Sequence, residues 1–374
     1  MRSKFQKRSK KTGLAPGSLI HVGNKYAEKS KITLIRYDET FFEEKEIGQI
    51  ADFHGEKDKQ GITWLNIDGL QDIKLFEDIG RLFGLHPLVL EDIISTDQRP
   101  KTEDYGDYIY LVLRNFHGQE DGDLLSDQVS IILGKGFILS FQEKESGLFN
   151  SIKDKISKNK GRIRKEGADY LAHAIIDNIV DNYFIVLENL EEKIEDLEDD
   201  LVKKTTPLTL EAIHILKREL ILLRKSLWPL REVVSALERS DSPLINKSTG
   251  IYFKDIYDHI IAIIDTVETF RDMLSGMLDI YLSTIKQQAK RSYEGPDHYC
   301  HHFYAFDVHC RSVRHEFQVY AGAGIPLGLF LRFRDYAGCR SFNVTVFQKK
   351  EMDLAVFNFI ALDKKICSIY RNII

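Results

Sequence analysis

Two runs of apolar residues that repeat at alternating steps of three and four constrain the fold of this 374-residue chain most strongly. The runs consist of Tyr183, Leu187, Leu190, Ile194, Leu197 and Leu201, and then of Ile213, Leu216, Leu220, Leu223, Leu227, Leu230, Val234 and Leu237. A short polar turn, KKTTP, separates them, in which Thr206 can cap the second helix and Pro207 can begin it. This pattern predicts an antiparallel helical hairpin, which we place at residues 169–250.

A third helical pattern follows at residues 251–285. It starts near Tyr252 and carries apolar residues at helical spacing: Ile256, Ile260, Ile263, Val267, Phe270, Leu274 and Met277. No capping or stop signal follows Tyr281, so we expect a long helix that is cut off rather than ended.

Residues 31–168 predict an α/β domain behind a basic, flexible lead-in at residues 1–30. Strands are expected at KITLIRYD, GITWLNID, YIYLVLRNF and VSIIL–GKG–FILSF, the last two segments forming a hairpin with turn glycines. Helices are expected at Ile73–Leu85 and after Pro87. The fold class is therefore α+β: a mixed sheet with helices on its faces, then the helical hairpin and the long helix.

Composition excludes some functions. A net charge of -5 does not favour general nucleic-acid binding, and the absence of cysteine before Cys300 favours a reducing compartment.

No stretch reaches the roughly 20 apolar residues that cross a bilayer. The nearest, Ala321–Phe330, is too short and is closed by Arg332 and Arg334, so the chain as written is expected to be soluble.

Carboxylates are the side chains that most suggest chemistry. They are Glu91, Asp92, Asp177, Asp181, Asp255, Asp258 and Asp279. Oxygen ligands suit hard divalent cations, and Mg²⁺ takes only one or two carboxylates. The alternative is that these acids only face solvent. The same two interpretations, a solvated face or a local concentration of cations, apply to the run EEKIEDLEDD.

The sequence also contains several multi-residue stretches that together resemble the CorA family of magnesium and cobalt channels. In chain order they are HPLVLED (86–92), QRPK, SDQVSIIL, FQEK, ADYL, LWPLRE, YFKDIYDH (252–259), DTVETFRD and LDIYLST. The resemblance extends from Gly13 to Ile285 and implies a homopentameric funnel in the cell (inner) membrane. Residues 1–285 would be cytoplasmic, and the third helix would be a stalk that continues as the pore lining.

The resemblance also implies roles for five acids. Asp92 and Asp255 resemble a pair that binds Mg²⁺ between neighbouring subunits and holds the pore shut. Glu91 and Asp177 resemble an adjoining metal site, and Asp279 resembles an acidic ring at the pore mouth. Mg²⁺ would be both regulatory and transported, with Co²⁺ as a possible substrate, and no nucleic acid or other small-molecule substrate is expected.

The Tyr-Gly-Met-Asn pore signature of that family is absent as written, but the neighbouring reading frame permits it. The codons of Val313-Arg314-His315-Glu316, displaced by one base, allow these four residues, and the flanking codons allow apolar helices and a basic end. We infer a one-base displacement near Ile285 to Lys286. Residues 286–374 would then be an out-of-frame remnant of two transmembrane helices.

The tail also holds a cluster of His298, Cys300, His301, His302, His309 and Cys310. These residue types are the preferred zinc ligands, but CHH-x7-C has no recognised zinc spacing.

The sequence therefore favours a Mg²⁺-gated divalent cation channel subunit that is non-conducting because its pore signature is lost. The main alternative is a soluble Mg²⁺-responsive remnant without transport, and an efflux branch of the superfamily is a weaker one. An enzyme is not expected, because no placed nucleophile or paired catalytic groups are present.

Overall fold

The computed structural model describes residues 13, 17, 19, 30–53, 61–118, 124–203, 205–294, 327–336 and 339–348. The chain divides into two compact units, Met1–Ala289 and Lys290–Ile374. The first unit is a sheet covered on both faces by helices, as the sequence predicts.

The sheet has seven strands in the order β2-β1-β3-β7-β6-β5-β4. Their bounds are Lys31–Tyr37 (β1), Phe42–Ile47 (β2), Ile62–Asp68 (β3), Lys101–Asp104 (β4), Tyr108–Gly118 (β5), Leu124–Gly134 (β6) and Phe137–Gln142 (β7). Only β3 and β7 pair in parallel, and all other neighbours are antiparallel. The expected mixed sheet is confirmed.

The β6–β7 hairpin shows how local sequence sets the register. Gly136 has φ 75°, a left-handed conformation that favours glycine. The Phe137 ring occupies the space beside Gly134, and a Cβ added there would lie 2.1 Å from it. The backbone therefore favours glycine at position 136, and a side chain at position 134 would require the Phe137 ring to move.

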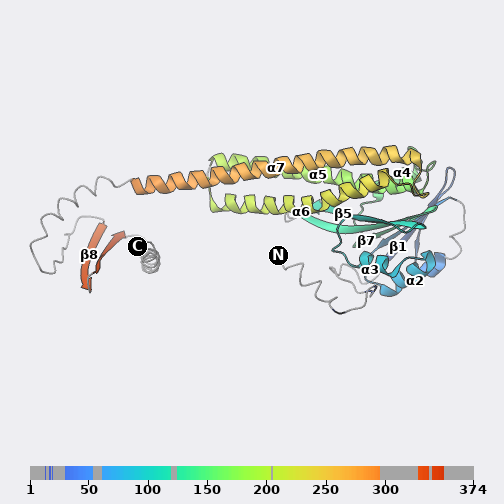
Figure 1. Cartoon of the computed structure of the whole chain (residues 1–374), viewed down its shortest axis with the longest axis horizontal. Helices are drawn as coiled ribbons and strands as arrows, with labels where there is room; N and C mark the ends of the chain where they lie inside the picture. The colour runs from blue at the N-terminus through green and yellow to red at the C-terminus, as the bar shows by residue number, and fades with distance from the viewer. Residues whose placement is uncertain are drawn as a thin grey trace, which may run out of the picture. The chain divides into compact units, whose positions relative to one another are not determined.

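Helices α2 (Ile73–Phe83) and α3 (Pro87–Ile94) cover one face of the sheet (Figure 1). Asp72 caps α2 by accepting a hydrogen bond from the Leu75 N–H, and Gly84 ends it with φ 67°. Pro87 begins α3 as expected, and the His86 ring accepts the Leu88 N–H at 3.2 Å. These caps fix where α3 begins and hence where its last turn lies.

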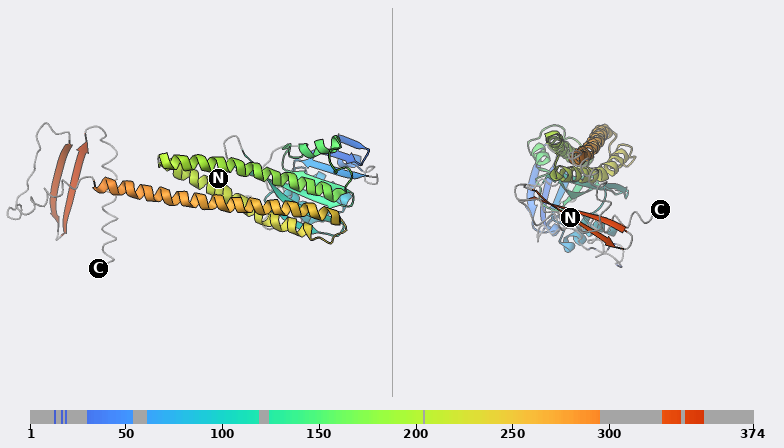
Figure 2. Two further views of the ribbon diagram at one scale, coloured as in Figure 1. Left: turned by 90° about the horizontal axis from the view of Figure 1, so that it is seen from above. Right: turned by 90° about the vertical axis from the view of Figure 1, so that its left-hand side faces the viewer.

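The other face carries α4 (Asn150–Ser157) and the three long helices α5 (Ala168–Lys203), α6 (Pro207–Glu238) and α7 (Lys247–Glu294). Figure 2 shows the three long helices side by side. Both heptad runs are buried in one seam, and Thr206 and Thr209 form a capping box at the start of α6. The predicted helical hairpin is confirmed.

Two hydrophobic cores lie on opposite sides of the sheet, because successive strand residues face opposite ways. In β5, Leu111 and Leu113 join the core under the long helices, whereas Tyr110 and Val112 join the core under α2 and α3. A side chain on α3 is therefore separated from one on α5 or α7 by the whole sheet.

The structure differs from the sequence expectations at β2, β4, α4 and both ends of α7. The short strands β2 and β4 and the helix α4 were not expected, since their sequences lack a clear apolar period. Helix α7 begins at Lys247 rather than near Tyr252. At this start the Asp169 carboxylate accepts hydrogen bonds from the Asn246 N–H and the Thr249 hydroxyl. The helix also continues past Ile285 to Glu294.

Within the described part of the second unit, β8 (Leu327–Tyr336) and β9 (Cys339–Gln348) form an antiparallel pair. The histidine and cysteine cluster at residues 298–310 lies outside the described residues. None of the described helices combines the length and the apolar composition that a bilayer crossing needs.

Candidate functional site: two acidic groups on opposite faces of the sheet

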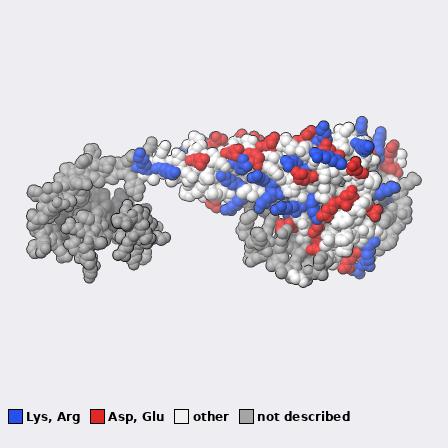
Figure 3. All heavy atoms as spheres, in the orientation of Figure 1, with Lys and Arg blue, Asp and Glu red and all other residues white. Residues whose placement is uncertain are grey.

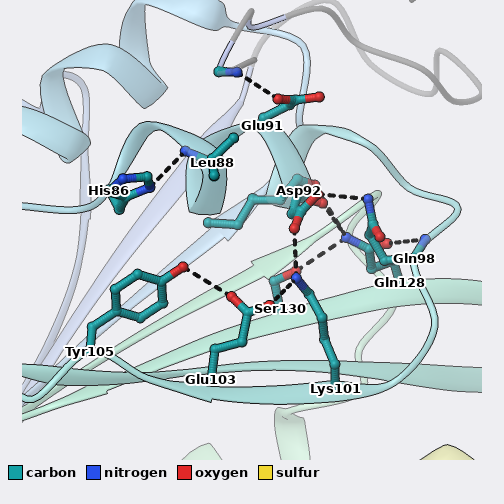
Figure 4. A network of polar contacts seen from close by, with 12 residues as sticks. His86, Leu88, Glu91, Asp92, Gln98, Lys101, Glu103, Tyr105, Gln128 and Ser130 are labelled. Atoms are coloured by element: carbon teal, nitrogen blue, oxygen red, sulfur yellow. Dashed lines mark hydrogen bonds and ion pairs between the residues drawn. The ribbon is translucent and has the colours of Figure 1, made fainter.

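The first acidic group lies in the last turn of α3. The Asp92 carboxylate accepts a hydrogen bond from the Gln98 side chain at 2.8 Å and from the Lys101 ammonium at 2.7 Å (Figure 4). Glu91, the next residue toward the N-terminus, accepts the Gly17 N–H at 2.8 Å. Both acids are half-buried, so neither is simply a solvated surface charge.

Residues from β6 and from the loop after α3 hold Asp92 in place. The Gln128 side chain donates to the Asp92 carbonyl at 2.9 Å and accepts the Gln98 N–H at 3.2 Å. Gln128 in turn donates its own N–H to Glu143 at 2.8 Å. Gln98, Gln128 and Lys101 were not predicted as site residues, although each lies in a stretch that carries the family resemblance.

A basic side chain on the edge strand β4 faces this group. The Lys101 ammonium donates to Glu103 at 2.6 Å as well as to Asp92, and Glu103 also accepts the Tyr105 hydroxyl at 3.0 Å. Burial would lower the pKa of Lys101, but the hydrogen bonds to Asp92 and Glu103 outweigh it and the pKa is raised. Burial, together with the hydrogen bond to Glu103, raises the pKa of Tyr105 to about 12.

The second acidic group lies where α5 and α7 pack together. Asp177 is half-buried on α5, and Asp181 and Asp255 are exposed nearby. Burial raises the pKa of Asp177, and the negative charges of Asp181 and Asp255 raise it further. Unlike Asp92, this group has no ion pair to a lysine or arginine among the described contacts.

His173, which lies next to the second group, does not neutralise it. Burial lowers the pKa of His173 to about 4, although the charge of Asp255 acts in the opposite direction. The His173 ring is therefore neutral near pH 7. Lys155 and His259 oppose the rise in the pKa of Asp177, so they offset part of the negative charge of Asp181 and Asp255. A hard divalent cation would relieve that repulsion, so the donor set suits Mg²⁺.

The two groups do not meet within one chain. Asp92 and Glu91 lie on α3, against one core, whereas Asp177 and Asp255 lie on helices that cover the other core. Across the described residues, no three histidine, cysteine, aspartate or glutamate side chains are arranged to hold a metal ion. One chain therefore does not bring acids of both groups to a single ion.

Asp279 belongs to neither group. It is exposed on α7, 24 residues beyond Asp255 (279 minus 255), which at a helical rise of 1.5 Å per residue is about 36 Å away. Its predicted role at a pore mouth is independent of the two groups.

The acidic run at residues 191–200 lies on α5 outside the apolar seam. Only Ile194 and Leu197 are buried there, and all other residues of the run are exposed. Figure 3 shows acidic side chains interspersed with basic ones over the helical part of the molecule. The run is thus a charged outer face, as expected from its position relative to the heptads.

Comparison with known proteins finds similar sequences. Residues 59–293 match the family described as CorA-like Mg2+ transporter protein. The chain is 43% identical over 281 residues to the cobalt/magnesium transport protein CorA of Thermotoga maritima, covering 75% of this chain and 80% of that protein. It is 26% identical over 223 residues to the CorA of Methanocaldococcus jannaschii, covering 59% of this chain and 69% of that protein.

Solved structures have the same fold. The complete structure of the M. jannaschii CorA magnesium transporter aligns with a TM-score of 0.62 at 19% identity, covering 78% of this chain and 89% of that one. The soluble domain of the same protein aligns with a TM-score of 0.57 at 21% identity, covering 67% and 96%.

Proposed function

The chain belongs to the CorA family, and from this premise we propose that it is a subunit of a membrane transporter for Mg²⁺, with Co²⁺ as a second substrate. The observation that carries the proposal is the 43% identity to a cobalt/magnesium transport protein over 281 residues. The proposal includes no enzymatic step.

We propose further that intracellular Mg²⁺ regulates the transporter through the two acidic groups. Asp92 of one chain and Asp255 of its neighbour would share one ion, and Glu91 and Asp177 would hold an adjoining one. The placement of these groups on opposite sides of the sheet supports sharing between chains, since one chain cannot bring an acid of each group to the same ion. A homopentamer in the inner membrane, with residues 1–285 in the cytoplasm, is the assembly that the family resemblance implies.

The physical mechanism is electrostatic. Carboxylates that face each other across a subunit contact repel, and a divalent cation between them reverses the sign of the interaction. A ligand that binds the closed arrangement better shifts the population toward it. A fall in intracellular Mg²⁺ would therefore loosen the contacts and favour opening.

The tail limits what the chain as written can do. Because the pore signature is absent as written and the neighbouring frame only permits it, we propose that this product does not conduct. Its second candidate function is that of a soluble Mg²⁺-responsive module, which the intact acidic groups of the first unit favour.

Limited proteolysis of the full-length chain across a Mg²⁺ titration tests the regulatory proposal. We expect Mg²⁺ to slow cleavage, and Asp92→Asn or Asp255→Asn to raise the midpoint at least about tenfold, equivalent to roughly 1.4 kcal/mol of lost ion binding. Asp272→Asn is the matched control, because this exposed acid pairs with Arg271 away from both groups. Equal midpoints in all four proteins would refute the regulatory role.

A further inference from the structure

The Asp92 carboxylate already has a cationic partner within its own chain. The Lys101 ammonium lies 2.7 Å from Asp92 and 2.6 Å from Glu103 (Figure 4). It also lies 5.4 Å from the centre of the Tyr110 ring. The ammonium holds the Oδ2 atom of Asp92, and its charge repels a cation that approaches the same oxygen. A metal that binds Asp92 through this oxygen therefore competes with Lys101.

The position of Lys101 allows such an exchange. It lies on β4, the edge strand, which pairs only with β5. The lysine side chain is a flexible stem that carries a compact charge, so the ammonium can move without a change of the backbone. About a quarter of each side chain is exposed, 28% for Lys101 and 24% for Asp92, so solvent and ions can reach the pair.

Glu103 gives the displaced ammonium another acceptor. Its hydrogen bond to Lys101 is separate from that of Asp92, and the Tyr105 hydroxyl holds the other carboxylate oxygen. Because Glu103 keeps the lysine paired after it leaves Asp92, displacement does not leave a half-buried charge alone.

We propose that Lys101 is a tethered competitor for the metal ligand Asp92 and that it sets the Mg²⁺ concentration at which the regulatory site fills. The proposal rests on the proposed function of Asp92. It adds that the Lys101 ammonium occupies the Asp92 carboxylate when Mg²⁺ is low. Glu103 lowers the free-energy cost of moving this ammonium away from Asp92. Lys101 is a positioning residue, since it acts on the ion only through Asp92.

The test is a Mg²⁺ titration of the full-length chain followed by thermal unfolding, with MgCl₂ as the probe at constant ionic strength. Lys101→Gln should lower the Mg²⁺ concentration at the midpoint of the titration about five- to tenfold, because a charge-assisted hydrogen bond no longer opposes ion binding. Glu103→Gln should raise the midpoint about twofold or more, since the lysine then depends on Asp92 alone. In the Asp92→Asn background, Lys101→Gln should have no further effect.

Lys45→Gln is the matched control, because it removes a lysine from a Glu43 ion pair on β2, another edge strand. Circular dichroism checks folding, and Lys101→Met, which keeps the apolar stem over Tyr110, replaces Lys101→Gln if that variant unfolds. A wild-type response that depends on Asp92 but not on Lys101 would overturn this inference and leave the proposed function intact. A wild-type chain with no Mg²⁺ response would overturn both.

Discussion

At the scale of single residues, Glu143 is the buried acid whose surroundings most favour the protonated form. It accepts the Gln128 N–H at 2.8 Å at the end of β7, close to Asp127 and Arg114. Burial raises the pKa of Glu143 from 4.5 to about 7, Asp127 adds to the rise, and the Gln128 N–H and Arg114 only partly oppose it. Glu143 therefore couples folding to protons in the neutral range.

The sign of this coupling follows from the raised pKa. Between about pH 4.5 and pH 7 the folded chain keeps the Glu143 proton and the unfolded chain loses it, so stability falls as pH rises. Over 2.5 pH units (7 minus 4.5) the loss is at most roughly 3 kcal/mol.

We expect Glu143→Gln to remove this part of the pH dependence. The variant should be more stable than the wild type at pH 8 and about equal to it near pH 4.5, as measured by urea unfolding. Glu145→Gln, at an exposed acid paired with Lys31, serves as the control and should keep the wild-type slope. An unchanged slope in Glu143→Gln would show that Glu143 is not the responsible group.

Some of the candidate site residues could be predicted from sequence, and their partners could not. Asp92 and Asp255 are predictable because they lie in stretches that carry the family resemblance. The Lys101–Asp92 pair is not, because β4 and α3 are separated by a loop whose path decides whether the two side chains meet. Spacing alone gives no distance across such a loop.

At the scale of elements, the α5–α6 hairpin depends on its apolar seam. Adjacent residues of α6 differ sharply in burial: Leu220 is 3% exposed and Ile221 is 53% exposed. A buried leucine loses both its transfer free energy and its packing when it is truncated, whereas an exposed side chain loses little.

Leu220→Ala should therefore destabilise the chain by about 2–5 kcal/mol, and Ile221→Ala should change the free energy of unfolding by less than about 0.5 kcal/mol. The two substitutions remove similar volumes from neighbouring positions, so each controls for the other. Chemical denaturation followed by circular dichroism measures the difference. Comparable losses would place Ile221 in a second packed surface.

Elements with a strong period were predictable, and edge elements were not. The heptads gave α5 and α6, and the apolar runs gave β1, β3, β5, β6 and β7. The strands β2 (FEEKEI) and β4 (KTED) are polar because they form the two edges of the sheet. Pairing with a neighbour, rather than an apolar pattern, makes them strands.

At the scale of the whole molecule, the proposed loss of the pore can be tested at the gene. Restoring the reading frame by one base near codons 285–286 should yield a product that supports Mg²⁺ uptake in a transport-deficient cell, while the chain as written should not. A synonymous change at codon 285 is the control. Uptake by the literal product equal to that of the repaired one would refute the displaced frame.

The sheet between α3 and the long helices has a genetic consequence under the proposed sharing of ions. Each chain would offer Asp92 to one neighbour and Asp255 to another. A chain altered at Asp255 would lose the ion at one of its two subunit contacts and would keep the ion at the other. In assemblies that mix altered and normal chains, the altered chains would then be partially rather than completely dominant. The loss of Mg²⁺ regulation would be proportional to the number of contacts that have lost their ion.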